Sequence, residues 1–293
     1  MTRRGVSGIR NMEVWGRLSP PQNNISPMTI LFLYILCGAT TGFLSGLLGI
    51  GGGLVVVPLL NMIFRLQGNI PSELIMHLAV GTSLSSILFT AVSSARSHAK
   101  RGGVLWGYVK GLAPAIVLGT LSAAWLASRM STAGLRAFFV VFLFFVATQM
   151  LVDFYPHPRK TIPGQAALAA AGFTIGSVSS LVGLGGGSMS VPFLRWCGVE
   201  MRKAVGTSAA ISWPIAVTGT IGFIIVGWNT PNLPEWSLGY VSLPATLGIA
   251  CSSVFFAPLG VKLSHALPVS ALRRFFAVFL YVTACEMLWN IFH

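Results

Sequence analysis

The feature that most constrains this chain is a series of apolar runs, separated by short polar loops, between residues 28 and 291. Hydrophobic residues occupy 54% of the 293 positions and charged residues only 9%, whereas a soluble domain has about 25% charged residues. About 20 apolar residues cross the hydrocarbon core of a bilayer as a helix. The sequence therefore predicts an all-α integral membrane protein with eight to ten membrane segments. The apolar runs lie at 28–50, 54–64, 75–95, 107–128, 134–152, 164–184, 188–197, 204–228, 238–260 and 270–291.

The chain has a net charge of +13, from 19 Lys and Arg against 6 Asp and Glu. In a soluble protein this excess would indicate a nucleic-acid partner. Here the basic residues lie in short loops between apolar runs, which is typical of cytoplasmic loops in membrane proteins. We therefore expect the lipid bilayer, and no nucleic acid, as a partner. The four cysteines form no CxxC pair, so neither a zinc site nor a disulfide framework is indicated, and no cofactor is expected.

Two halves of the chain are similar in sequence. The segment GFLSGLLGIGGGLVVVPLL (42–60) matches GSVSSLVGLGGGSMSVPFL (176–194) at 10 of 19 positions. In the same order, AVGTS (79–83) recurs at 204–208, and LRAFFVVFLFFVATQML (135–151) recurs as LRRFFAVFLYVTACEML (272–288). We interpret these matches as an internal duplication. It divides the chain into a basic N-terminal tail at 1–27, a first transmembrane repeat at 28–153, a linking loop at 154–163 and a second repeat at 164–293.

The placement of Lys and Arg discriminates between two topologies. If all ten segments cross and the N-terminus is outside, twelve basic residues lie inside and seven outside. If the short segments 54–64 and 188–197 enter the membrane and return, eight crossings remain, and with the N-terminus inside the split is 10 to 9. The first distribution is the more uneven. We therefore expect two inverted repeats of five segments each, with both termini outside.

Each half has a glycine cluster at the end of a long apolar run, followed by a proline. Glycine costs about 1 kcal/mol relative to alanine in a helix interior, so adjacent glycines predict an interrupted helix. Inside a bilayer, such backbone is tolerated only where it is packed in protein or lines a wet cavity. Free N–H groups and the positive end of the restarting helix would form an anion site without a charged side chain. The predicted substrate-binding positions are Gly49, Gly51, Gly52, Gly53 and Pro58, and Gly183, Gly185, Gly186, Gly187 and Pro192.

The alternative for these glycines is close helix packing, because small residues let helices approach each other in membranes. A motif GxGGG-x₄-P that is duplicated at membrane depth favours the binding interpretation over the packing one.

The second duplicated motif places hydroxyl groups early in a long helix of each half, at Thr82 and Ser83 and at Thr207 and Ser208. These hydroxyls could donate hydrogen bonds to an oxyanion. The alternative is that they bond back to carbonyls of their own helix. Ser45 and Ser179 are weaker candidates of the same kind.

Glu286 is the acidic residue that falls inside a predicted span, where ionisable groups are costly and usually functional. It could carry a proton for coupled transport. The alternative is that it reaches the membrane interface, because it lies near the end of the last apolar run.

The paired GxGGG-x₄-P motifs, each followed by AVGTS, resemble the TauE/SafE family of sulfite exporters and sulfonate uptake permeases. The resemblance covers nearly the whole chain beyond residue 27. It implies a multi-pass protein of the cell membrane that transports sulfite, sulfonates or related organosulfur anions, with seven or eight spans. Ser188 and Ser190 replace Leu54 and Val56 of the first half. We therefore expect the second glycine cluster to supply more hydroxyl donors, with Ser188 among the binding residues.

Three functions remain open at this point. The leading hypothesis is a secondary carrier of a small inorganic or organic anion, with a proton or sodium as coupling ion. ATP hydrolysis is not indicated, because the chain has no P-loop GxxxxGK[ST]. A passive anion channel is the alternative. An intramembrane enzyme is least favoured, since the chain has no HExxH motif and no paired intramembrane carboxylates.

Overall fold

The structure is a computed structural model that describes residues 26–48, 52–152, 164–264 and 269–292. Each predicted apolar run corresponds to one helix, which confirms the all-α architecture. A pair of two-residue antiparallel strands, β1 (Ser237–Leu238) and β2 (Val241–Ser242), lies between helices α9 (Met201–Gly227) and α10 (Leu243–Ser264). The helices are α2 (Pro27–Leu48), α3 (Gly53–Gln67), α4 (Ile75–Lys100), α5 (Trp106–Arg129), α6 (Thr132–Val152), α7 (Gln165–Val182), α8 (Gly187–Trp196), α9 (Met201–Gly227), α10 (Leu243–Ser264) and α11 (Val269–Phe292).

Within the described residues, six helices are long and apolar enough to cross a membrane: α4, α5, α6, α7, α9, and α2 over Pro27–Ser45. Helix α3 and the apolar part of α10, Leu243–Leu259, are shorter. Helix α8 has 10 residues and is about 15 Å long, roughly half the thickness of the hydrocarbon core. It therefore cannot cross a bilayer by itself.

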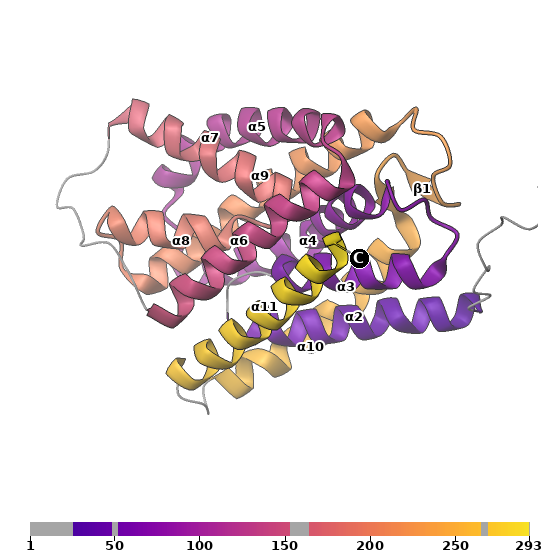
Figure 1. The fold of residues 1–293 in the computed structure, drawn as a ribbon. Helices are drawn as coiled ribbons and strands as arrows, with labels where there is room; N and C mark the ends of the chain where they lie inside the picture. The colour runs from indigo at the N-terminus through magenta and orange to yellow at the C-terminus, as the bar shows by residue number, and fades with distance from the viewer. Residues whose placement is uncertain (1–25, 49–51, 153–163, 265–268, 293) are drawn as a thin grey trace, which may run out of the picture.

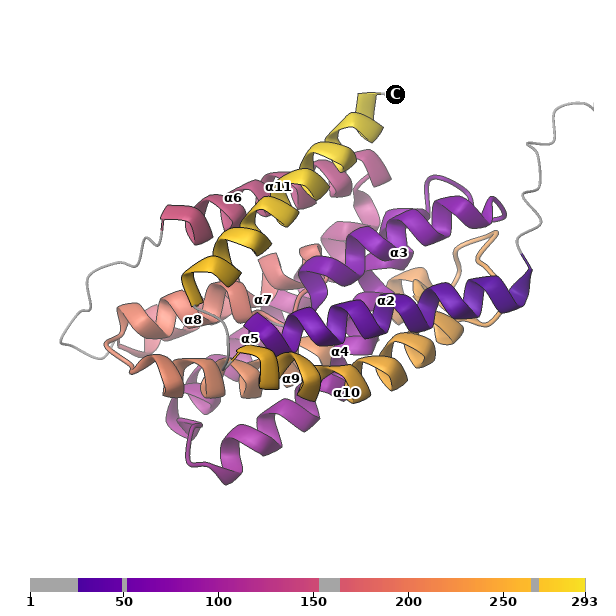
Figure 2. The same ribbon diagram turned by 90° about the horizontal axis from the view of Figure 1, so that it is seen from below.

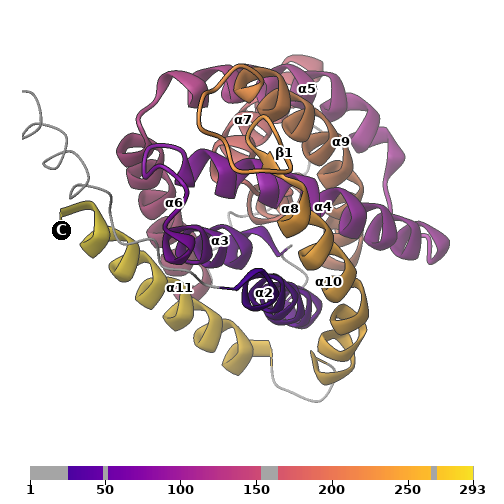
Figure 3. The same cartoon turned by 90° about the vertical axis from the view of Figure 1, so that its right-hand side faces the viewer.

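Helices α2 and α10 lie side by side in Figures 1 and 2, whereas α6 and α11 run obliquely to them. Helix α2 begins on the right of Figure 1, whereas α7, its counterpart in the second half, begins on the left. The AVGTS-bearing helices α4 and α9 pack against each other, and most of α4 is buried. Helices α6 and α11 also pair, and they lie together on one side of the bundle when it is seen end on (Figure 3).

The two halves interlock by exchanging helices. The most extensive helix contact joins α2, the first helix of the first half, to α10, the fourth helix of the second half. The next joins α7 to α5, which is the same pairing with the halves interchanged. The bundle is therefore one interlocked unit rather than two lobes that meet at a flat interface.

Both exchanged contacts depend on a duplicated GxxxG pattern, at Gly38 and Gly42 in α2 and at Gly172 and Gly176 in α7. A Cβ atom added at Gly42 would lie 2.6 Å from the Cα atom of Ser253 in α10. One added at Gly176 would lie 2.5 Å from the carbonyl oxygen of Ile116 in α5. These glycines let helix backbones pack directly against each other, as small residues commonly do in membranes.

We predict that Gly176→Ala destabilises the protein by about 1–3 kcal/mol, the usual cost of overpacking a closely packed contact. The added methyl group would meet the backbone of α5, which cannot yield without moving the helix. Thermal unfolding of the purified protein in mild detergent measures the effect.

Gly107→Ala in α5 is the matched control, because a Cβ atom there would have no atom outside its immediate helical surroundings within 4 Å. We expect this control to unfold at the wild-type temperature. Equal unfolding temperatures for both variants would show that the α5–α7 contact accommodates a side chain.

Candidate functional site

The second glycine cluster is a complete interruption between two helices. Helix α7 ends at Val182 and α8 begins at Gly187. Gly183 and Gly186 have φ angles of +74° and +80°, in the left-handed region that glycine enters without steric cost. The sequence interrupts the helix here because two of its glycines adopt a conformation that other residues avoid.

The first cluster joins α2, which ends at Leu48, to α3, which begins at Gly53. Gly49 and Gly51 lie outside the described residues. Gly52 is the N-cap of α3 and has right-handed backbone angles, with φ −69°. The described parts of the two clusters therefore differ in conformation as well as in sequence.

The structure brings the two clusters into direct contact. A Cβ atom at Gly53 would lie 2.6 Å from the carbonyl oxygen of Gly183, and one at Gly183 would lie 2.9 Å from the Val57 side chain in α3. The start of α3 thus packs on the end of α7, with Val80 of α4 beside them. The duplicated glycines meet at the interface between the halves.

The carboxyl end of α7 is capped by hydrogen bonds. The N–H of Leu184 donates to Ser179 O at 2.7 Å, and the N–H of Gly183 donates to Ser180 O at 3.2 Å, which is a glycine-based cap. The Ser83 hydroxyl of α4 donates to Gly183 O at 2.8 Å. These bonds reduce the negative potential that the end of a helix would otherwise present.

Unlike the carboxyl end of α7, the amino ends of the two short helices have no side-chain cap among the described residues. Helices α3 and α8 both have glycine N-caps, at Gly52 and Gly186. The first N–H groups of a helix have no partner within it, so they depend on a cap, water or a ligand. Two such amino ends favour a negative charge nearby.

Two buried hydroxyls accompany the start of α8. Ser188 lies in its first turn, and Ser179 lies in the last turn of α7, with its Oγ atom 3.5 Å from the Cβ position of Gly186. Ser179 is fully buried and Ser188 is 9% exposed, yet neither Oγ atom has a hydrogen-bond partner in the described part of the chain. Buried polar groups normally have partners, so these two hydroxyls are available to a ligand.

The hydroxyls of Ser190 and Ser212 are engaged. The Ser190 hydroxyl is hydrogen-bonded to Gly186 O at 2.8 Å and to the Ser208 hydroxyl of α9 at 2.7 Å. Gly185 packs against Ser212, whose hydroxyl donates to Ser208 O at 3.0 Å. Gly187 is buried as the first residue of α8. Ser208 therefore reaches the second glycine cluster through Ser190.

The two AVGTS threonines bind the opposite half instead of their own helices. The Thr82 hydroxyl accepts a 3.0 Å hydrogen bond from the N–H of Ser242, immediately before α10. The Thr207 hydroxyl accepts a 3.0 Å bond from the N–H of Leu105, immediately before α5. Each threonine thus binds the start of the other half's fourth helix. The sequence suggested neither contact.

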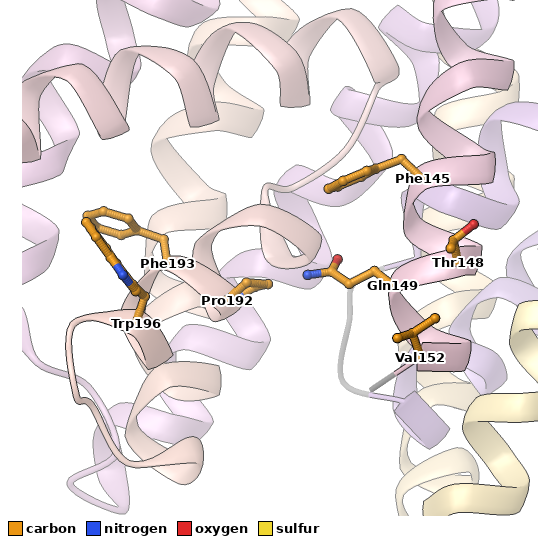
Figure 4. Close-up of a pocket in the computed structure, with 7 residues that line it drawn as sticks. All are labelled: Phe145, Thr148, Gln149, Val152, Pro192, Phe193 and Trp196. Atoms are coloured by element: carbon orange, nitrogen blue, oxygen red, sulfur yellow. The ribbon is translucent and has the colours of Figure 1, made fainter. Parts of the chain in front are cut away.

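The other predicted positions lie apart from this cluster of hydroxyls. Pro58 and Pro192 are inside α3 and α8, and Pro192 lines a separate pocket that faces α6 (Figure 4). Glu286 is exposed near the end of α11 and interacts electrostatically with Arg136 of α6. The α6–α11 pairing provides that interaction, which the sequence alone could not indicate.

Comparison with known proteins supports a transport function. A family model described as "Sulfite exporter TauE/SafE" matches residues 34–287. A "Probable membrane transporter protein" of Haemophilus influenzae is 38% identical, over 88% of this chain and 98% of that protein. Probable membrane transporter proteins of Methanocaldococcus jannaschii and Bacillus subtilis are 29% and 28% identical, over 89% and 86% of this chain and 96% and 95% of their own lengths. No solved structure matches the chain.

We predict that Thr82→Val and Thr207→Val each destabilise the protein by about 1–3 kcal/mol, because each leaves a backbone N–H without its buried partner. Thr82→Ser and Thr207→Ser should recover most of the loss, since they restore the hydroxyl. Thermal unfolding of the purified variants measures both effects.

Thr90→Val in α4 is the matched control, because its hydroxyl bonds only to Ile87 O of its own helix among the described contacts. Thr82→Val and Thr207→Val variants that unfold at the same temperature as Thr90→Val would contradict the conclusion that these threonines stabilise the contact between the halves.

Proposed function

The chain belongs to the sulfite exporter TauE/SafE family of membrane transporters, and from that premise we propose that it is a secondary carrier of a small anion bound where its two glycine clusters meet. The protein is a multi-pass membrane protein of a transporter family, not of an enzyme family. We propose sulfite, a sulfonate or a related organosulfur anion as substrate. The family description names sulfite, and the site offers hydrogen-bond donors to oxyanion oxygens.

One observation carries the proposal: at the second cluster the end of α7 is capped by hydrogen bonds, whereas the start of α8 has no side-chain cap among the described residues. The carboxyl end of α7 is closed by hydrogen bonds from Gly183, Leu184 and Ser83. The amino end of α8 has no side-chain cap among the described residues, and two unpartnered hydroxyls lie beside it. A site with a capped carboxyl end and available donors at an amino end favours an anion over a cation.

We further propose that the halves are inverted repeats. Helices α2 and α7 start on opposite sides of the bundle (Figure 1), and the exchanged contacts α2–α10 and α7–α5 are related by interchanging the halves. Carriers built from such repeats hold substrate at the repeat interface and expose it alternately to the two sides. Helix α8 is too short to cross by itself, so the count of basic residues that assumes ten crossings does not decide the orientation.

Energy for transport would come from an ion gradient, with a proton or sodium as coupling ion. Glu286 is the candidate for proton coupling that the sequence offers. Its exposed position and its interaction with Arg136 suit a structural role as well.

Transport by Glu286→Gln in vesicles, measured with and without a proton gradient, separates the two roles. Only the loss of a coupling residue changes the response of transport to the gradient.

We predict that Ser188→Ala and Ser179→Ala each raise KM for sulfite about tenfold or more. A hydrogen bond to a charged group contributes about 1.5–3 kcal/mol, and about 1.4 kcal/mol corresponds to a factor of ten. Flux into vesicles that contain the purified protein measures KM. Counterflow by a preloaded anion distinguishes a carrier from a channel.

Ser45→Ala is the matched control, since Ser45 is the equivalent of Ser179 in the first half. We expect its KM to stay close to that of the wild type. Unchanged KM in all three variants would exclude the second cluster as the source of the hydroxyl donors.

We predict that Gly186→Ala abolishes transport, whereas Gly52→Ala retains it. Gly186 has a positive φ, and a Cβ atom there would lie 2.5 Å from Ile215 Cδ1. At Gly52 the nearest atom would be 3.6 Å away, which is ordinary contact. Flux and surface expression are measured together, so that a variant that inserts but does not transport is distinguished from one that fails to insert. Wild-type flux in Gly186→Ala would show that transport does not require the left-handed turn.

A further inference from the structure

A pocket of about 600 Å³ lies between α6 and α8 (Figure 4). Helix α6 contributes Phe145, Gln149 and Val152 to its lining, together with Thr148. Helix α8 contributes Pro192, Phe193 and Trp196. The Thr148 hydroxyl is engaged by Phe144 O and the Tyr281 hydroxyl of α11, at 2.7 and 2.6 Å. The pocket therefore presents mainly hydrocarbon and aromatic surface, with the Gln149 amide as its polar group.

Helices α6 and α8 have hardly any direct contact, and the pocket occupies the space between them.

The pocket lies on an exposed face of a candidate membrane span. Helix α6 is a membrane-span candidate, and two of its lining residues, Phe145 and Val152, are 58% and 65% exposed. An apolar opening on such a face is filled by hydrocarbon when the protein is in a bilayer, because water has no polar partners there.

One end of the pocket has the features of a membrane interface. Val152 is the last residue of α6 and Trp196 the last residue of α8, and Trp favours the interface between hydrocarbon and water. Arg195 lies in the last turn of α8, and its Nη1 atom donates to Val199 O at 3.4 Å. A guanidinium has five N–H donors, so this contact leaves donors for a phosphate.

Basic residues follow α8 closely in the sequence. Exposed Arg202 and Lys203 begin α9, just after the turn at 197–200, and that turn contains one acid, Glu200. Basic residues near a membrane surface contribute about 1 kcal/mol each to attraction for anionic lipid. Since a lipid chain is already in hydrocarbon, preferential binding requires such headgroup contacts in addition to the pocket.

We propose that this pocket binds one acyl chain of an anionic phospholipid, with the phosphate beside Arg195 and the chain running inward past Trp196 and Val152 toward Phe145. The lipid occupies the space between α6 and α8, while α8 packs on α9. This inference concerns lipid binding alone and does not rest on the proposed substrate.

Native mass spectrometry of the purified protein, with phosphatidylglycerol or phosphatidylcholine added, tests the proposal. We expect a retained phosphatidylglycerol molecule on the wild type, and its loss in Val152→Trp, where the indole would fill the pocket. Val141→Trp is the matched control, because Val141 is three turns away on the same face of α6, is 68% exposed and does not line the pocket. Arg195→Gln should remove the preference for phosphatidylglycerol over phosphatidylcholine.

Equal lipid retention by Val152→Trp and Val141→Trp would overturn the proposal. A wild-type protein that binds a second copy of the chain at this pocket in place of lipid would also overturn it. A second measurement does not depend on the tryptophan insertions. Phospholipids brominated in the acyl chain should quench wild-type fluorescence more than that of Trp196→Phe, and equal fractional quenching in both would place the lipid elsewhere.

Discussion

A peptide group in the hydrocarbon core has no water to bond, so an interrupted membrane helix depends on the protein for its hydrogen bonds. At the second glycine cluster, carbonyl groups at the end of α7 receive bonds from Gly183, Leu184 and Ser83. The start of α8 receives no corresponding side-chain cap in the described part of the chain. The proposed anion site follows from this difference between a capped carboxyl end and an uncapped amino end, and it requires no charged side chain.

The AVGTS motif connects that site to the architecture. Its glycine lets a loop of the opposite half approach closely: Gly81 lies against the carbonyl of Tyr240, and Gly206 against that of Gly103. Its threonine then binds the first residues of that half's fourth helix, and Ser83 reaches the second glycine cluster. The same few residues therefore brace the exchanged helices and shape the site. Because the halves interlock, alternating access would require movements within the bundle rather than separation of two lobes.

Local sequence patterns predicted the ten helices and the interruption at Gly183–Gly187, because apolar runs and adjacent glycines act over short distances. The partners of Thr82 and Thr207 lie 160 and 102 residues away, and nothing local to the motif identifies them. For the same reason, the interaction of Glu286 with Arg136 was not predictable. The duplicated GxxxG of α2 and α7 was a visible signal that the sequence analysis overlooked. Its equivalence in both halves could have indicated the exchanged contacts.

The two similar halves share some features and differ in others. Positions where backbones touch or a threonine braces a helix are equivalent in both, since a change in one would disturb the interlocking. Positions at the short helices diverged: Ser188 and Ser190 stand opposite Leu54 and Val56, and α3 has 15 residues against 10 in α8. A symmetric site would present matched donors from both sides. An anion with its charge on one group needs donors on one side only, so a symmetric scaffold with one polar helix start is sufficient to hold it.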